Sequence, residues 1–195
     1  SSLFDNTTGS NNVAVGRTAL ENNTTASNNT AMGYQAQYSN TTGTLNTSVG
    51  HSSLYTNTTG TDNAAFGHAA LYYNTTGRYN TALGKNALER NTTANNNTAV
   101  GFQSSYFNTT GASNVSVGYQ ALYGATGVTT GSFNTAIGRD ALRSNTTASN
   151  NTAMGYQAAY TNATGADLTA IGYRALYYST GNANTAVGYN VMQQN

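Results

Sequence analysis

A small residue, a large apolar residue and a glycine recur together at regular intervals along the whole chain, for example at Ala99-Val100-Gly101. The glycines that close these triplets, called the coil glycines below, are Gly16, Gly33, Gly50, Gly67, Gly84, Gly101, Gly118, Gly138, Gly155, Gly172 and Gly188. Eight of the ten steps between them are 17 residues long, and the other two are 20 and 16 residues. A fixed period is typical of a solenoid, in which each repeat buries apolar surface against its neighbours. We therefore predict that residues 1–195 form a single repeat solenoid.

Four positions of the repeat, numbered from the coil glycine, always or mostly carry the same kind of side chain. Position −1 is large and apolar, positions −2 and +3 are small with one exception, and position +4 is mostly leucine, as at Leu88. These runs predict two short strands in each repeat, from about −4 to +1 and from about +2 to +6, with the glycine at the bend between them. The polar stretch Asn-Thr-Thr-Gly, as at 57–60, supplies turn residues that return the chain.

The predicted fold is all-β: a parallel β-solenoid, or β-roll, of about eleven coils of 17 residues. One such repeat cannot bury a core alone, but stacked coils can, because each strand bonds to its counterparts above and below. We expect the −1 and +4 side chains to line the core. Helices are disfavoured because the apolar segments are short, each contains glycine, and Asn and Thr are poor helix formers.

Stacking turns each repeat position into a column of side chains that runs along the solenoid. Position −4 is asparagine in every repeat but one, where Leu168 replaces it: Asn12, Asn29, Asn46, Asn63, Asn80, Asn97, Asn114, Asn134, Asn151 and Asn184. Aligned asparagine amides can bond to one another along the stack. We interpret this column as a structural asparagine ladder.

Composition excludes several classes of function. Charged residues make up 7% of the chain and the net charge is +1, so there is no basic field for nucleic acid and no polybasic patch for a membrane surface. There is no cysteine, and no apolar run is long enough to span a bilayer. His51 and His68 share position +1 in successive repeats without a carboxylate in that register, and the six acidic residues are scattered. We predict no catalysis, no metal site and no cofactor.

The repeats at 33–36 (Gly-Tyr-Gln-Ala), 118–122 (Gly-Tyr-Gln-Ala-Leu) and 155–158 resemble two related families. They resemble the head repeats of trimeric autotransporter adhesins, and still more those of bacterial and phage tail-fibre-domain proteins. The resemblance covers nearly the whole chain. It implies a left-handed parallel β-roll, often trimeric, on a cell or virion surface.

This resemblance, with the regular length and neutral outer turns, leads us to expect a structural or adhesive subunit of an extracellular fibre. We expect it to self-associate, most simply as a trimer, through one of two aromatic columns at +1 and +5. The tyrosines that we single out as interface or glycan-binding candidates are Tyr34, Tyr119, Tyr156 and Tyr173 at +1, and Tyr38, Tyr55, Tyr72, Tyr106, Tyr160 and Tyr177 at +5; Tyr189 and Tyr123 continue the two columns. Exposed rings could instead stack on surface glycans. We also expect uncapped ends whose backbone edges pair with another chain in an extended fibre.

Two further features of the turns bear on function. Asn-Xaa-Ser/Thr triplets, which are acceptors for N-linked glycans, recur at Asn6, Asn23, Asn40, Asn57, Asn74, Asn91, Asn108, Asn145 and Asn162. Either these asparagines are glycosylation sites in an outer turn, or Asn-Thr-Thr-Gly is simply good turn sequence. The threonine pairs at 7–8, 24–25 and 41–42 also stack in register, which is the basis of an alternative function, an ice-binding β-solenoid.

Overall fold

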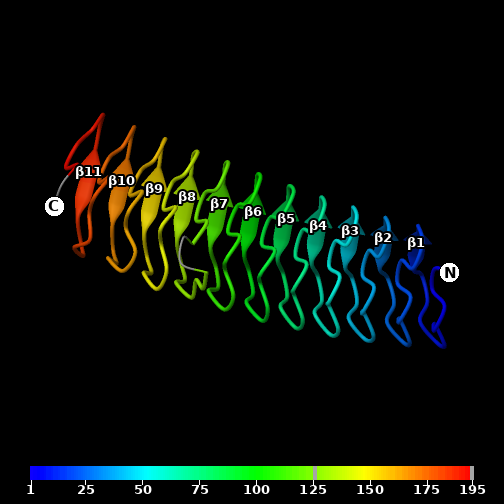
Figure 1. Ribbon diagram of the computed structural model, residues 1–195. Coiled ribbons are helices and arrows are strands. Elements are labelled where there is room, and N and C mark those ends of the chain that lie inside the picture. Colours follow the sequence, from blue (N-terminus) through cyan, green and yellow to red (C-terminus); the bar gives the residue numbers. More distant parts are fainter. Residues whose placement is uncertain (125–126, 194–195) are drawn as a thin grey trace.

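The computed structural model describes residues 1–124 and 127–193 and shows a parallel β-solenoid, which confirms the predicted fold class. Its strands are β1 (Val13–Val15), β2 (Thr30–Met32), β3 (Thr47–Val49), β4 (Ala64–Phe66), β5 (Thr81–Leu83), β6 (Thr98–Val100), β7 (Val115–Val117), β8 (Thr135–Ile137), β9 (Thr152–Met154), β10 (Thr169–Ile171) and β11 (Thr185–Val187). They form one sheet in sequence order. The coils follow one another along a single axis, so that β1 and β11 lie at opposite ends of an elongated molecule (Figure 1).

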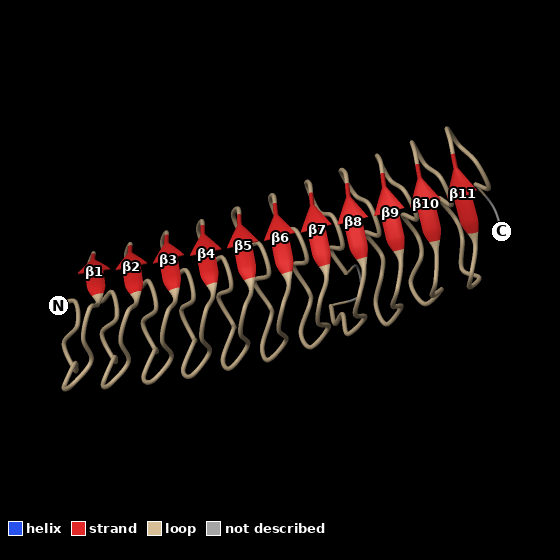
Figure 2. Cartoon of the chain, turned by 180° about the vertical axis from the view of Figure 1, so that it is seen from behind, coloured by secondary structure: helices blue, strands red, loops and turns tan. Residues whose placement is uncertain are grey.

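The register of the sheet follows the sequence repeat throughout. In β6, for example, Val100 pairs with Leu83 of β5 and with Val117 of β7. The longer and shorter repeats keep the same pairing, because Val117 lies opposite Ile137 and the −1 residues of β10 and β11 are also partners. The length changes are therefore absorbed in the loops, which lie away from the strands (Figure 2).

The face of each strand that packs against the core is the opposite of the predicted one. The middle residue of each three-residue strand, at −2, is buried in β2 to β11 and half-buried in β1 (Ala14), whereas the −1 residue is exposed or half-buried. Val100 and Ile137 are half-buried and Val187 is 63% exposed, so the prediction that −1 residues line the core is wrong. Successive side chains of a strand point to opposite faces, so −2 and −1 cannot both face inward. The small −2 residue is the one that fits a thin coil opposite the +4 leucine.

The core consists of the +4 leucines packed with alanines from −2 and +3. The buried leucines are Leu20, Leu54, Leu71, Leu88, Leu122, Leu142 and Leu176, as predicted, together with Leu168. Polar side chains that enter this layer form hydrogen bonds within it, although Gln37 Oε1 has no partner among the described residues. Gln37 donates to the Ser48 hydroxyl at 3.0 Å, and Ser104 donates to the Ser116 hydroxyl at 2.7 Å.

The segment from +2 to +6 is a run of turns, so the predicted second strand is wrong. Positions +2 and +4 have left-handed backbone conformations, with φ of 59° at Asn86 and 49° at Leu88. Their N–H groups bond in opposite directions along the stack: Asn86 donates to His68 of the preceding coil at 2.9 Å, and Leu88 donates to Ser104 of the following coil at 3.0 Å. The segment therefore binds both neighbours without extended strand geometry. Left-handed conformations cost roughly 1–2 kcal/mol per non-glycine residue, which burial and these bonds must offset.

The coil glycines allow the backbones of successive coils to come close together. Gly101 has a φ of +127°, a conformation that side chains disfavour. A Cβ atom at this position would lie 2.5 Å from the carbonyl oxygen of Gly118 in the next coil. The coil glycines are therefore required by the close approach of neighbouring coils, in addition to the bend that the sequence predicted.

Candidate functional site

The outer face of the sheet carries an uninterrupted column of large apolar side chains. This apolar column consists of the −1 residues Val15, Met32, Val49, Phe66, Leu83, Val100, Val117, Ile137, Met154, Ile171 and Val187. Several are well exposed, including Val15 at 54% and Leu83 at 49%. Soluble monomers rarely expose long contiguous apolar patches, and such patches mark interaction surfaces.

The two predicted aromatic columns form ladders of stacked rings, which Glu89 interrupts at +5 and Lys85 interrupts at +1. Along +5, the rings of Tyr38 and Tyr55 stack at 5.2 Å between centroids, and those of Tyr55 and Tyr72 at 4.9 Å. Arg143 continues this column, since its guanidinium carbon lies 5.1 Å from the ring centroid of Tyr123. Ring faces inside these ladders are covered by neighbouring coils. The ladders thus offer mainly ring edges and hydroxyl groups to a ligand.

Three tyrosines of the +5 column have perturbed acid–base properties. Burial raises the pKa of Tyr72, Tyr106 and Tyr177 above the usual value of 10.0, because the phenolate loses hydration there. Neighbouring rings add to this at Tyr72 and Tyr177, and the Glu89 carboxylate adds to it at Tyr106. These tyrosines stay neutral at physiological pH and do not act as bases.

The asparagines of the Asn-Xaa-Ser/Thr triplets point into the solenoid, so the prediction that they lie in an exposed outer turn is wrong. All of them except the half-buried Asn6 have fully buried side chains: Asn23, Asn40, Asn57, Asn74, Asn91, Asn108, Asn145 and Asn162. Between Asn6 and Asn108 each amide nitrogen donates to the amide oxygen of the preceding coil, at 2.8 to 3.1 Å. These buried amides are unavailable to a glycosyltransferase in the folded chain. They form a second asparagine ladder, called the +7 ladder below.

The asparagines at −4 connect coils by a different bond. The backbone N–H of Asn63 donates to Asn46 Oδ1 at 3.0 Å, and Asn63 Nδ2 donates to the Gly77 carbonyl at 2.8 Å. The same pattern of a backbone donor and a side-chain acceptor continues to Leu168, whose N–H donates to Asn151 Oδ1 at 2.9 Å. These contacts match a structural role for the −4 column.

The threonines of each turn split into an inner and an outer column. At +8 the hydroxyl donates to the carbonyl of the next coil, as from Thr75 to Thr92 and from Thr92 to Thr109, both at 3.0 Å. At +9 the side chain is exposed, as in Thr76 and Thr93. Only one threonine of each predicted pair therefore presents a free hydroxyl to solvent.

The two histidines stack on each other rather than converge on a site. The His51 and His68 rings lie 5.1 Å apart between centroids. Over residues 1–124 and 127–193, no group of three or more His, Cys, Asp or Glu side chains is placed to hold a metal ion. Nor does that part of the chain include a helix of the length and apolarity that crossing a membrane requires.

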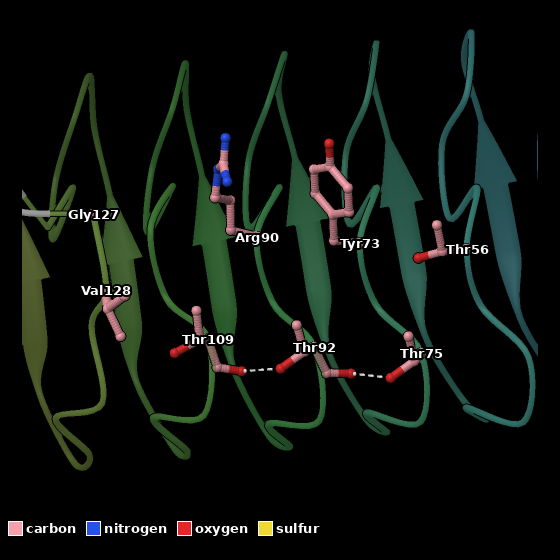
Figure 3. Close-up of a pocket in the computed structure, with 8 residues that line it drawn as sticks. All are labelled: Thr56, Tyr73, Thr75, Arg90, Thr92, Thr109, Gly127 and Val128. Atoms are coloured by element: carbon pink, nitrogen blue, oxygen red, sulfur yellow. Dashed lines mark hydrogen bonds between the residues drawn. The ribbon is translucent and has the colours of Figure 1, made fainter.

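A groove on the loop side of the solenoid is lined by residues of five successive coils, at a place where the repeat is irregular. Its volume is about 380 Å³, and it is lined by Thr56, Tyr73, Thr75, Arg90, Thr92, Thr109, Gly127 and Val128. Figure 3 shows Tyr73 and Arg90 on one side of a row formed by Thr75, Thr92 and Thr109, with Val128 at the end of the row. Small-ligand sites have volumes of roughly 300 to 1,000 Å³, so the groove is large enough to be one.

Sequence reasoning missed this groove, although a signal for it exists. Position +6 is small or polar in most coils, as at Thr56, but Tyr73, Arg90 and Phe107 occupy it in three successive coils. The three extra residues of the longest repeat fall in the next coil and bring Val128 to the same place. In an array of near-identical repeats, clustered departures of this kind point to a local site.

Comparisons with known proteins add no identity to this geometry. No protein-family model matches the chain, and no curated protein or solved structure matches it either.

Proposed function

We propose that this protein is a structural or adhesive segment of an extracellular fibre, without catalytic activity, and that it associates with copies of itself. The observation that carries the proposal is the exposed apolar column on an elongated, regular solenoid. Water contact with such a column is unfavourable by roughly 25 cal/mol for each Å² of apolar surface. Association of chains along their length removes that contact.

A second copy of the chain is a well-matched partner for this face. The apolar column has one member per coil and contains no charged residue. Two copies therefore carry the same spacing of side chains over eleven strands, and each apolar ridge can meet another along its length. The ring faces of the aromatic ladders are already covered, so we place the self-association surface at the sheet rather than at the tyrosines. Three chains around one axis would bury all three apolar columns together.

The test is the molar mass of the protein in solution, measured by light scattering after size-exclusion chromatography. The native chain should elute at about three times the 20.2 kDa of one chain. Replacing Leu83 and Met154 with lysine should give monomers with an unchanged circular dichroism spectrum, because both side chains are outside the core. The matched control replaces the exposed Thr76 and Thr147 with lysine and should leave the mass unchanged. A native mass of 20.2 kDa would refute the proposal, as would equal masses for both variants.

The ice-binding alternative rests on the exposed +9 threonines, which form one column of free hydroxyls along the solenoid. The +8 hydroxyls are committed to bonds between coils, so the flat double array of threonines that this function would use is absent among the described residues. A measurement of thermal hysteresis separates the two proposals. Depression of the freezing point without self-association would favour ice binding over the fibre.

A further inference from the structure

We propose that the groove at Tyr73 and Arg90 binds a carboxylated sugar unit of an acidic polysaccharide. The proposal deepens the adhesive part of the function proposed above. It rests on four properties of the groove: an apolar floor, an aromatic wall, a cation without an acidic partner, and an open course along several coils.

The floor of the groove is apolar although threonines form it. The hydroxyls of Thr75, Thr92 and Thr109 all donate to carbonyls of the following coil, at 3.0, 3.0 and 3.2 Å. Figure 3 shows their methyl carbons directed toward the side on which Tyr73 and Arg90 stand. Thr56 is committed in the same way, since its hydroxyl donates to the Tyr72 carbonyl at 2.9 Å. With Val128, these methyl groups make a surface suited to the C–H face of a sugar ring.

Tyr73 differs from the tyrosines of the ladders because no second ring stacks on it among the described residues, and the Arg90 guanidinium covers one of its faces. It meets Tyr72 edge-on, with an interplanar angle of 66°, and it is 41% exposed. At +6 the next coil carries Arg90 instead of another ring, and the preceding coil carries Thr56. An exposed aromatic face beside an apolar floor is a platform on which the C–H groups of a sugar can pack.

Arg90 supplies a positive charge that is held in place. Its guanidinium carbon lies 5.6 Å from the ring centroid of Tyr73, 5.5 Å from that of Phe107 and 5.8 Å from that of Tyr106. Among the described residues, both ion pairs involve Asp140, so Arg90 has no acidic partner there. A guanidinium matches a carboxylate through two parallel hydrogen bonds.

Glu89 is the acidic group nearest to Arg90 in the sequence, and its carboxylate is already engaged. It accepts a hydrogen bond from the Tyr106 hydroxyl at 3.1 Å and another from the Asn86 amide. No ion pair joins Glu89 to Arg90 among the described residues, so the guanidinium remains able to pair with a ligand carboxylate.

The lining of the groove favours a polysaccharide over a peptide. The carbonyls of Thr92, Thr109 and Thr129 that border it already accept hydrogen bonds from the floor threonines. A peptide laid on this floor would therefore find no free carbonyl there to pair with its own backbone N–H groups. A sugar unit can place its C–H face on the floor and keep its hydroxyls in water. Since the lining residues of the groove come from five successive coils, neighbouring units of a polymer can continue along it.

The test is direct binding by isothermal titration calorimetry, with tetragalacturonate, a hyaluronan tetrasaccharide and 3′-sialyllactose as probes. At least one acidic probe should bind, and its neutral counterpart (the methyl ester, or lactose for sialyllactose) should bind at least tenfold more weakly. Arg90→Gln should weaken acidic binding about tenfold, and Tyr73→Ala should abolish it.

The matched control is Tyr178→Ala. Tyr178 also occupies +6 and also meets its neighbour Tyr177 edge-on, at 76°, but it lies outside the groove. The Tyr178→Ala variant should bind the acidic probes with the affinity of the native chain. The proposal is overturned if none of the three probes binds at concentrations up to about 10 mM. It is also overturned if acidic and neutral probes bind equally, or if Arg90→Gln binds the acidic probe with unchanged affinity. Light scattering on the same samples reports self-association separately, so failure of the sugar site and failure of the fibre proposal are distinguishable.

Discussion

The +7 ladder should contribute strongly to stability, and replacing Asn74 with alanine tests this. Asn74 Nδ2 donates to Asn57 Oδ1 at 2.8 Å and to the Gly77 carbonyl at 3.1 Å, and its Oδ1 accepts from Asn91 Nδ2 at 2.8 Å. All three bonds disappear in Asn74→Ala. The Gly77 carbonyl keeps a second donor, Asn63 Nδ2 at 2.8 Å, but Asn57 Oδ1 is left buried without one.

The magnitude follows from these bonds. Each buried hydrogen bond contributes roughly 1 kcal/mol net, and an acceptor left unpaired costs about 1 to 3 kcal/mol more. Asn74→Ala should therefore lower the free energy of unfolding by about 4 kcal/mol. Asn6→Ala, at the half-buried end of the ladder, loses only the bonds to the Gly9 carbonyl and from Asn23, and should cost about 2 kcal/mol.

Equilibrium unfolding in urea, followed by circular dichroism, measures these differences if the slopes of the transitions are equal. Thr76→Ala is the control, because this exposed side chain lies two residues away from Asn74 in the same turn. It should change the free energy of unfolding by less than about 0.5 kcal/mol. The reasoning fails if Asn74→Ala is no more destabilising than Thr76→Ala, or if the losses at Asn6 and Asn74 are the same.

Three further predictions concern the strand, the coil glycine and the tyrosines. Ala99→Asp should prevent folding, because it places a charge in the core. Val100→Asp should lower the free energy of unfolding by less than about 2 kcal/mol, since this half-buried side chain faces outward. Thermal denaturation of both variants shows whether Ala99→Asp is the less stable of the two. Gly101→Ala should destabilise by more than about 3 kcal/mol, through its left-handed φ of +127° and the clash with the Gly118 carbonyl, and a melting temperature near that of the native chain would contradict this. Because burial raises the pKa of Tyr72, Tyr106 and Tyr177, their stabilising effect should be complete below pH 10 and should be lost as pH rises through the folded pKa values. Absorbance at 295 nm during alkaline titration should show a late-ionising fraction, which the triple phenylalanine variant lacks.

The sequence by itself determined the period, the class of fold and the places where side chains are impossible. A 17-residue repeat of short apolar segments has no way to bury surface except by stacking, so the parallel solenoid follows from the pattern. The coil glycines were predictable for a similar reason: a glycine in a fixed register indicates a backbone position where a Cβ does not fit, as Gly101 shows. The +4 leucines were placed correctly in the core, whereas the equally apolar −1 residues were not.

Only the tertiary structure decided which face of each segment is inside. An alternating strand has two faces, and the sequence does not say whether the large −1 residue or the small −2 residue meets the core. The thin coil takes the small one, so Val100 faces outward and Ala99 inward. The same ambiguity misplaced the turn asparagines, since Asn74 suits both an exposed turn and a buried ladder, and only stacking supplies its partners in adjacent coils.

The groove illustrates the last kind of information that the linear pattern lacks. Tyr73, Arg90 and Val128 are separated by 17 and 38 residues in the sequence, and they share a site only because the loops of successive coils lie side by side. Repeat positions predict columns, but a site built across columns depends on how +6, +8 and an extra loop pack together. That packing is set by the path of the left-handed turns between the strands, which residue periodicity does not encode.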